Sequence, residues 1–230
     1  MPEADLGVVI VTGGASGLGR AVAAAVAAEG GHPVVLDVQR PDEEREAVLV
    51  DLADGRAAEE AVRGVGERHG RIDAVVTAAG IDACGDLADV AADAWERVIA
   101  VNLVGTAAVV RAALPWLLDG RGRVVTVAST LALRALPAAT AYCASKFGVL
   151  GFSRALAAET AGRIGVTTLI PGGMRTAFFD DRDPQFKPGP DAVLNDPADV
   201  ARAVVFALRQ PPGCEVREML VAPAVEPSWP

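Results

Sequence analysis

Two side chains capable of proton transfer lie one helical turn apart in this sequence. The chain contains a single tyrosine, Tyr142, and one of its two lysines, Lys146, follows four residues later. On a helix, this spacing places both side chains on the same face. A free tyrosine has a pKa of about 10 and is a poor base at neutral pH, but a neighbouring ammonium stabilises the phenolate. We therefore expect Tyr142 to act as a general base on an alcohol or as a general acid toward a carbonyl oxygen.

A serine is expected to join this pair. Ser129 ends a predicted strand 13 residues before Tyr142, and its hydroxyl is expected to hold the same substrate oxygen. Plainer interpretations stay open at this point. A lone tyrosine is often a half-buried packing residue, and a serine at the end of a strand is often a helix cap.

A glycine-rich turn follows the first predicted strand and opens a helix. Residues 12–19 read TGGASGLG, and glycines here let backbone N–H groups approach a pyrophosphate at the positive end of the helix. In this strand–turn–helix setting the turn predicts a dinucleotide site. An oxidised nicotinamide bound there would add positive charge that favours the Tyr142 phenolate. The candidate contacts in the turn are Gly13, Ser16, Gly17, Leu18 and Gly19.

The choice of cofactor depends on the end of the second predicted strand. Asp37 lies 20 residues beyond Gly17, the separation at which an acidic residue meets the adenosine ribose hydroxyls. A carboxylate there accepts hydrogen bonds from NAD and repels the 2′-phosphate of NADP, so we expect NAD. Arg40 is close enough to leave NADP open.

The elements that position these residues alternate between short apolar strands and Ala-rich helices. Because the first strands are apolar throughout, we expect them to be covered on both faces. Repeated strand–helix–strand units predict a single α/β domain over 1–230, a Rossmann-type, doubly wound parallel sheet. The predicted strands are 8–12, 34–37, 48–51, 74–77, 123–128, 165–170 and 218–222. The predicted helices are 18–29, 55–69, 92–118, 141–160 and 197–210, and Pro115 is expected to kink or end the third.

One segment lacks any helical or strand period. Residues 180–196 are rich in Asp, Pro and charge, and they follow the sixth predicted strand. That position puts the segment at the carboxyl edge of the sheet, where ligands bind in such folds. We expect a substrate loop near 177–196, with a simple surface loop as the alternative.

Composition excludes several function classes. With 51% apolar and 22% charged residues the chain is not expected to be disordered, and its net charge of −9 argues against nucleic acid as a partner. The longest charge-free stretches reach 14 residues, as in 6–19, too short for the roughly 20 that a membrane span needs. Acidic residues at the start argue against a signal peptide, so we expect a cytoplasmic location.

The cysteines and histidines predict neither disulfides nor a metal site. Cys84, Cys143 and Cys214 are odd in number and far apart, which favours reduced thiols. Neither His32 nor His69 stands in ligand spacing with a cysteine, and no set of three or four ligands can be assembled from the sequence.

Taken together, the motifs resemble the short-chain dehydrogenase/reductase family. They are the glycine turn, Asn102, Ser129 and the pair Tyr142 and Lys146, and they keep the family's order over nearly the whole chain. The resemblance implies a seven-stranded parallel sheet flanked by helices. It implies that Tyr142 is the acid/base, that Ser129 polarises the substrate oxygen, and that Lys146 holds the nicotinamide ribose and tunes Tyr142. Asn102 would position a water that relays protons through Lys146.

Further cofactor contacts follow from the resemblance alone. They are Asp51 and Leu52 at the adenine, Ala79 and Gly80 beside the cofactor, and Pro171, Gly172 and Thr176 at the nicotinamide carboxamide. The chain departs from the family at 77–80, which reads TAAG in place of Asn-Asn-Ala-Gly. The asparagine bonds that brace the sheet there are therefore absent, which puts local rigidity in doubt.

The leading hypothesis is an NAD-dependent oxidoreductase that moves a hydride between a secondary alcohol or ketone and nicotinamide. The alternatives are an NADP-dependent ketoreductase, a dinucleotide-binding regulator without turnover, and epimerase or dehydratase chemistry, for which the chain leaves little room. Family members often form dimers or tetramers, and the tail with Trp229 is expected either to reach a neighbouring subunit or to fray. The expected pocket walls suggest a largely apolar small-molecule substrate. They are Leu131, Leu133, Leu136, Phe178 and Phe179.

Overall fold

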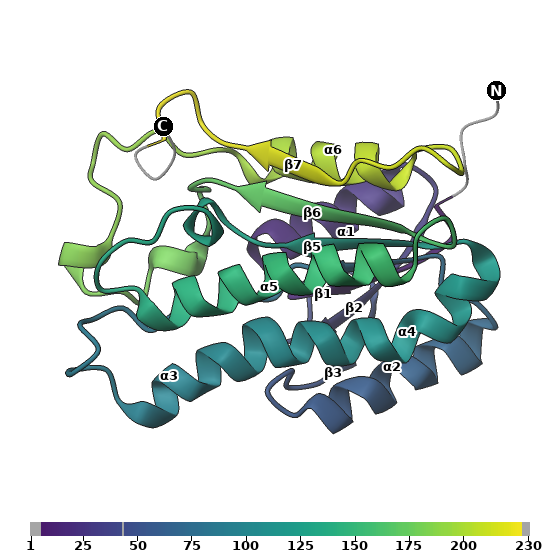
Figure 1. Ribbon diagram of the computed structural model, residues 1–230, viewed down its shortest axis with the longest axis horizontal. Helices are drawn as coiled ribbons and strands as arrows, with labels where there is room; N and C mark the ends of the chain where they lie inside the picture. The colour runs from purple at the N-terminus through teal and green to yellow at the C-terminus, as the bar shows by residue number, and fades with distance from the viewer. Residues whose placement is uncertain (1–5, 43, 227–230) are drawn as a thin grey trace.

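Seven parallel strands form one twisted sheet at the centre of the molecule (Figure 1). The computed structural model describes residues 6–42 and 44–226. The strand order is β3-β2-β1-β4-β5-β6-β7. The strands are β1 (Val8–Thr12), β2 (His32–Asp37), β3 (Glu46–Leu49), β4 (Ala74–Thr77), β5 (Arg123–Val127), β6 (Gly165–Pro171) and β7 (Glu218–Val221). The predicted Rossmann-type fold is confirmed, and each predicted strand overlaps an observed one.

Helices cover both faces of the sheet. In Figure 1, α2, α4 and α5 lie on the near face, and α1 and α6 lie behind the strands. The helices are α1 (Gly17–Ala28), α2 (Gly55–His69), α3 (Ala92–Ile99), α4 (Thr106–Gly120), α5 (Thr140–Glu159) and α6 (Pro197–Leu208). Each begins or ends within two residues of its prediction, apart from the long third one.

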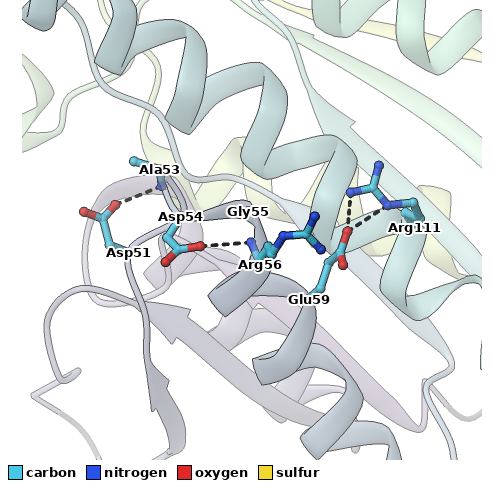
Figure 2. A pocket seen from close by; sticks show the side chains of 7 residues that line it. All are labelled: Asp51, Ala53, Asp54, Gly55, Arg56, Glu59 and Arg111. Atoms are coloured by element: carbon cyan, nitrogen blue, oxygen red, sulfur yellow. Dashed lines mark hydrogen bonds and ion pairs between the residues drawn. The ribbon is translucent and has the colours of Figure 1, made fainter.

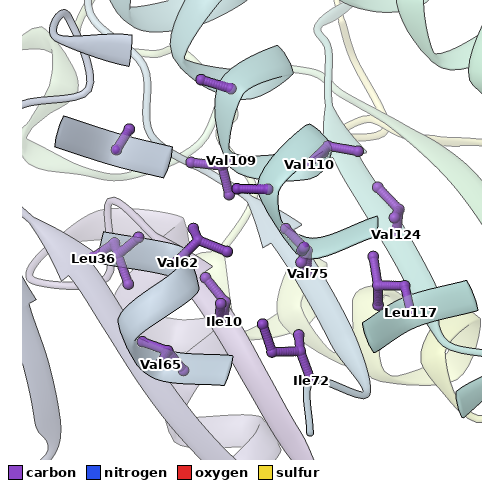
Figure 3. Close-up of a cluster of buried hydrophobic side chains, with 14 of the residues drawn as sticks. Ile10, Leu36, Val62, Val65, Ile72, Val75, Val109, Val110, Leu117 and Val124 are labelled. Carbon is purple, nitrogen blue, oxygen red and sulfur yellow. The ribbon is translucent and has the colours of Figure 1, made fainter. Parts of the chain in front are cut away.

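Alternate residues of the inner strands pack into two different hydrophobic clusters, one on each face of the sheet. Ile10 of β1 packs with α2 and α4 on the near face, whereas its neighbours Val9 and Val11 pack with α1 and α6 on the other. Figure 3 shows the near core, where strand residues meet Val62 of α2 and Leu117 of α4. This double burial explains why the strands are apolar throughout rather than alternating.

The predicted helix over 92–118 is one continuous helical stretch with an irregular middle. Residues Ala100–Gly105 form a π-helical turn between α3 and α4, and such turns often mark functional sites. The expectation that Pro115 ends the helix is wrong, because α4 continues to Gly120. Among the described residues, the stretch Ala92–Gly120 is long and apolar enough to cross a membrane, and 56% of its most apolar window is buried inside the fold.

The strand order reverses at the middle of the sheet. β1 lies between β2 and β4. The chain leaves β1 through α1 toward β2 on one side, and it leaves β4 through α3 and α4 toward β5 on the other. At such a point the loops after neighbouring strands separate and leave a crevice at the carboxyl ends of the strands. The segment 177–196 follows β6 at this edge and contains two short 3₁₀ turns, Ala177–Phe179 and Pro184–Phe186. Trp229 lies outside the described residues.

Candidate active site

Tyr142, Lys146 and Ser129 meet at the carboxyl edge of the sheet. Tyr142 and Lys146 lie one turn apart on α5, and the Lys146 Nζ lies 5.5 Å from the centre of the tyrosine ring. Ser129 lies two residues beyond the end of β5, and its hydroxyl is hydrogen-bonded to the Tyr142 phenol. The Ser129 Oγ also accepts a hydrogen bond from the backbone N–H of Leu131 at 3.1 Å. The Ser129 hydroxyl therefore caps the short helical turn that follows it and also hydrogen-bonds to Tyr142.

The environment of Tyr142 favours the neutral phenol in the protein by itself. Burial raises the pKa of Tyr142 to about 12, the hydrogen bond with Ser129 opposes this rise, and the carboxylate of Asp82 adds to it. The Arg182 guanidinium also opposes the rise in pKa. The lowering expected from Lys146 together with an oxidised nicotinamide stays a prediction. Ionisation of the phenol at neutral pH therefore requires additional positive charge close to the ring.

Lys146 is almost fully buried, with 3% of its surface exposed. Its Nζ donates a hydrogen bond to the backbone carbonyl of Val127 at 2.8 Å. Burial disfavours the ammonium and lowers the pKa of Lys146 to about 8, while the Asp82 carboxylate acts in the opposite direction. A Cβ built on Gly80 would lie 3.5 Å from this Nζ and 3.6 Å from the Asn102 Oδ1. These two candidate residues therefore share one small space beside Gly80.

The lowered pKa of Lys146 predicts that stability rises with pH in a defined window. Below pH 8 the lysine is protonated in both states, and the folded state carries the cost of a buried charge. Between pH 8 and about 10.4 the unfolded chain still binds the proton that the folded protein has lost, so the free energy of unfolding increases with pH. The raised pKa of Tyr142 acts only above about pH 10.

Lys146→Met is expected to remove this slope. Urea unfolding at pH 7, 8, 9 and 10 should show wild type gaining stability relative to Lys146→Met as the pH rises. The difference between the proteins is the readout, because other titrating groups cancel and the loss of the Val127 hydrogen bond affects all pH values alike. Parallel pH profiles for the two proteins would contradict the assigned burial effect.

Asn102 occupies the π-helical turn and ties three segments together. Its side-chain Oδ1 accepts from the Ile81 N–H at 2.8 Å, and its Nδ2 donates to the Ile81 carbonyl at 2.9 Å and to the Ser145 Oγ at 3.0 Å. The Ser145 hydroxyl in turn donates to the Tyr142 carbonyl at 2.8 Å. The amide of Asn102 therefore fixes the loop after β4 against the helix that carries Tyr142.

The glycine turn has the geometry that a dinucleotide cradle needs. Gly13 has a φ of +67°, and a Cβ there would lie 2.7 Å from the Ala79 Cα; a Cβ at Gly19 would lie 2.2 Å from the Gly13 carbonyl oxygen. Larger residues would therefore push the turn away from β4. Ser16 is exposed at the start of α1, and its side chain makes no capping hydrogen bond. Leu18, by contrast, is buried under the helix.

Asp37 lies beside this turn, as its spacing predicted. Its Oδ2 accepts a hydrogen bond from the Ala15 N–H and its Oδ1 from the Gln39 N–H, each at 3.0 Å. The Gly13 N–H also donates to the carbonyl of Leu36 at 2.9 Å. The carboxylate is thereby held at the rim of the cradle. The turn and Asp37 together suit the pyrophosphate and ribose of a nicotinamide dinucleotide.

The adenine contacts implied at Asp51 and Leu52 are less directly supported. The Asp51 carboxylate accepts the Ala53 N–H and pairs with Arg97 at 2.9 Å, and these contacts lower its pKa. Leu52 is buried. Figure 2 shows that Asp51 borders a hollow over the start of α2, on whose far side Glu59 and Arg111 are paired. An adenine role for Asp51 and Leu52 stays a prediction.

The segment after β6 approaches the cradle from the other side. A Cβ built on Gly17 would lie 3.5 Å from the Thr176 Cβ, and the Thr176 hydroxyl accepts a hydrogen bond from the Phe178 N–H. The Gly172 N–H donates to Val221 of β7 at 3.0 Å, which fixes the end of β6 after Pro171. Thr176 thus faces the glycine turn, and contacts of Pro171, Gly172 and Thr176 with the nicotinamide stay a prediction.

The departure from the family pattern at 77–80 is partly compensated. The Ala79 N–H donates to the Thr12 Oγ1 at 3.1 Å, so a threonine braces β1 against the loop after β4. The buried Thr77 Oγ1, however, has no hydrogen-bond partner. The bracing expected to be missing is therefore supplied from β1, and one polar atom remains unsatisfied.

Two functional candidates carry no motif and were missed by sequence reasoning. Arg182, in the loop after β6, pairs with Asp82, in the loop after β4, at 2.7 Å. The guanidinium lies 4.8 Å from the ring of Phe178 and 4.7 Å from that of Phe179, and the Phe178 ring lies 5.7 Å from the Tyr142 ring. This ion pair joins positions 100 residues apart, beside the ring that contacts Tyr142, and no local spacing reveals it.

Of the expected pocket walls, Phe178 is the one seen in direct contact with Tyr142. Leu131 and Leu133 are half-buried and Leu136 is 40% exposed. All three cysteines are free thiols, as predicted, although they are not all packed as small hydrophobes. The Cys84 thiol donates to Asp82, and burial together with that carboxylate raises its pKa to about 11, whereas Cys214 is exposed.

Several curated proteins are similar to this chain in amino-acid sequence. A curated relative, 2-dehydro-3-deoxy-L-rhamnonate dehydrogenase (NAD(+)) of Sphingomonas sp., is 35% identical over 182 residues, which cover 74% of this chain and 73% of the relative. Glycine betaine reductase ATRR of Emericella nidulans is 35% identical over 240 residues, which cover 96% of this chain. The match spans 19% of that much longer protein.

Solved structures show the same fold. An alcohol dehydrogenase from the archaeon Thermococcus sibiricus, complexed with 5-hydroxy-NADP, superposes with a TM-score of 0.82 at 25% identity and covers 93% of this chain and 95% of its own. The named relatives thus include both an NAD(+) enzyme and an NADP complex. The model of the short chain dehydrogenase family matches residues 7–186. The chain belongs to this family of nicotinamide-dependent oxidoreductases.

Proposed function

We propose that this protein is an NAD-dependent dehydrogenase of secondary alcohols, or a reductase of the corresponding ketones, with Tyr142 as the acid/base. The observation that carries the proposal is the meeting of Tyr142, Ser129 and Lys146 at the carboxyl edge of the sheet, beside the glycine turn. A bound nicotinamide dinucleotide supplies the carbon that accepts or donates the hydride.

Each residue has a role that its surroundings support. Ser129 and Tyr142 are hydrogen-bonded to each other, so a substrate oxygen can be held between the two hydroxyls. Tyr142 then takes the alcohol proton or gives one to the carbonyl oxygen. Lys146, buried with a pKa of about 8, changes protonation close to physiological pH and is suited to hold a ribose hydroxyl. Asn102 keeps the Tyr142 helix and the loop after β4 in register.

The preference for NAD rests on Asp37. Its carboxylate is held at the rim of the glycine turn by two backbone N–H groups, where it can accept hydrogen bonds from both ribose hydroxyls. The same negative charge opposes a 2′-phosphate. The relative from Sphingomonas is named for NAD(+), which supports the same choice, and Arg40 keeps NADP as the second candidate.

The substrate is proposed to be a small molecule with an apolar part next to its secondary alcohol. Phe178 lies against Tyr142, and Phe179 lies behind it with the rings 5.5 Å apart. A screen of secondary alcohols that found turnover of small polyols alone would reject this apolar wall.

The first test is a separate titration with NADH and NADPH, followed by energy transfer from the protein's three tryptophans. We expect NADH to bind more tightly, and secondary alcohols then to be oxidised in the presence of NAD. Tighter NADPH binding would reject Asp37 as the discriminating group and favour a reductase. Binding of neither would reject the enzyme assignment.

A further inference from the structure

Both histidines of the chain converge on one carboxylate at the edge of the sheet away from Tyr142. His32 is the first residue of β2, Glu46 is the first of β3 and His69 is the last of α2. The sequence, in which the three lie far apart, predicted no metal site. The fold instead places one potential ligand atom from each within 4.8 Å of the others.

The periodicity of the elements explains this meeting. Val34 of β2 packs against α2 in the near core, and His32, two residues earlier, lies on the same face of the strand. Glu46 is paired with Val34 across the sheet and shares that face. Val65 is buried on α2, and His69, four residues later, lies on the same side of the helix. The three polar residues therefore lie at the end of one continuous apolar layer between the sheet and α2.

The distances are close to those of a metal centre. The Glu46 Oε2 lies 2.9 Å from the Nε2 of His32 and 2.9 Å from the Nε2 of His69, and the two imidazole centres are 5.1 Å apart. A tetrahedral Zn²⁺ with bonds of about 2.0–2.2 Å keeps its ligand atoms about 3.3–3.6 Å apart. The two Nε2–Oε2 separations are shorter than those around a bound Zn²⁺, and the half-exposed His32 side chain would turn to admit the ion.

The second carboxylate oxygen has its own partner. Arg68 pairs with the Glu46 Oε1 at 2.8 Å, and the His69 Nε2 also lies 3.2 Å from that oxygen. The Oε2 is the oxygen that lies 2.9 Å from the Nε2 of both rings. Ligating carboxylates in metal sites are typically held by an outer hydrogen bond of this kind.

We propose that His32, Glu46 and His69 form a binding site for one divalent transition-metal cation of the Zn²⁺ class, with water completing the shell. Two imidazoles and a carboxylate suit Zn²⁺, Co²⁺ or Ni²⁺ and not the hard cations Mg²⁺ and Ca²⁺. Each ring binds through Nε2 and carries its proton on Nδ1. The cation joins β2, the short edge strand β3 and the end of α2, and it stabilises this corner of the fold.

The test uses tag-free, chelator-treated protein titrated with ZnCl₂ and needs no nicotinamide cofactor. In ¹⁵N-labelled protein the two imidazoles give the side-chain histidine signals, and we expect both to change together and to saturate at one Zn²⁺ per chain. An equal concentration of MgCl₂ should leave them unchanged. Zinc binding that leaves either ring unchanged, as binding at the cysteines would, overturns the proposal.

Variants add a second readout. His69→Gln and Glu46→Gln should each weaken zinc binding at least tenfold in calorimetry and abolish the zinc-dependent rise in melting temperature. Glu67→Gln removes the same charge from an exposed position of α2 and should bind zinc like wild type. Equal weakening by Glu67→Gln would mean that bulk charge attracts the ion and would reject the site. If a ligand variant fails to fold, the wild-type ring signals still decide.

Discussion

Tyr142→Phe is expected to lower kcat by about 10²- to 10⁴-fold, the range that a general acid/base contributes, while the affinity for NADH stays close to that of wild type. The substitution keeps the ring that packs on Phe178 at 5.7 Å and deletes the hydroxyl bound to Ser129. Because the packing survives, a fall in kcat reports the proton-transfer step. Steady-state kinetics on the best alcohol of the screen, paired with NADH titration, measure both quantities.

The matched control is Thr140→Val, on the first turn of the same helix. Its hydroxyl accepts a hydrogen bond from the Trp95 indole at 3.1 Å and lies away from the Tyr142–Ser129 pair. This variant is expected to keep wild-type kcat. A Tyr142→Phe protein that turns over within threefold of wild type would remove the tyrosine from the mechanism. Inactive wild type that binds NADH would instead favour the regulator without turnover.

The fold was predictable because its signals are local and repeated. Apolar strands followed by helices at regular intervals admit few topologies, and right-handed crossovers reduce them further. Ile10 and its neighbours are buried on opposite faces of the sheet, and for this reason β1 is apolar at successive positions. The π-helical turn at Ala100–Gly105 has no such local pattern. The sequence therefore predicted one long helix and gave no sign of the π-helical turn, and the helix does not end at Pro115.

The candidate site was predictable where residue type and spacing coincide. Tyr142 and Lys146 share a helix face. Asp37 lies 20 residues beyond Gly17 of the glycine turn, the spacing typical of an acidic residue at the ribose. The ion pair between Asp82 and Arg182 depends on two loops meeting across 100 residues, which no local pattern encodes. The burial that raises the pKa of Tyr142 is likewise a property of the assembled site, and no local pattern encodes it.

Asp37→Ser is expected to shift the ratio of NADH to NADPH affinity by about 100-fold toward NADPH. In the ratio, the change removes the proposed hydrogen bond to the 2′-hydroxyl, which NADPH lacks and which is worth about 1.5–3 kcal/mol for a charged acceptor, and it removes the repulsion of the 2′-phosphate. In this variant the Asp37 carboxylate no longer competes with the 2′-phosphate of NADPH for Arg40, three residues beyond. Fluorescence titrations with both cofactors give the two dissociation constants.

The ratio is the proper readout because Asp37 also supports the turn. Its Oδ2 accepts a hydrogen bond from the Ala15 N–H. Serine is shorter and loses this contact, so the affinities for NADH and for NADPH are both expected to fall, in addition to the change in their ratio. Asp42→Asn removes one charge from an exposed position after the same strand and should leave the ratio unchanged. If Asp37→Ser also leaves it unchanged, discrimination does not lie in this carboxylate. A ratio that moves in both variants would instead show that long-range charge, and not a contact with the ribose, selects the cofactor.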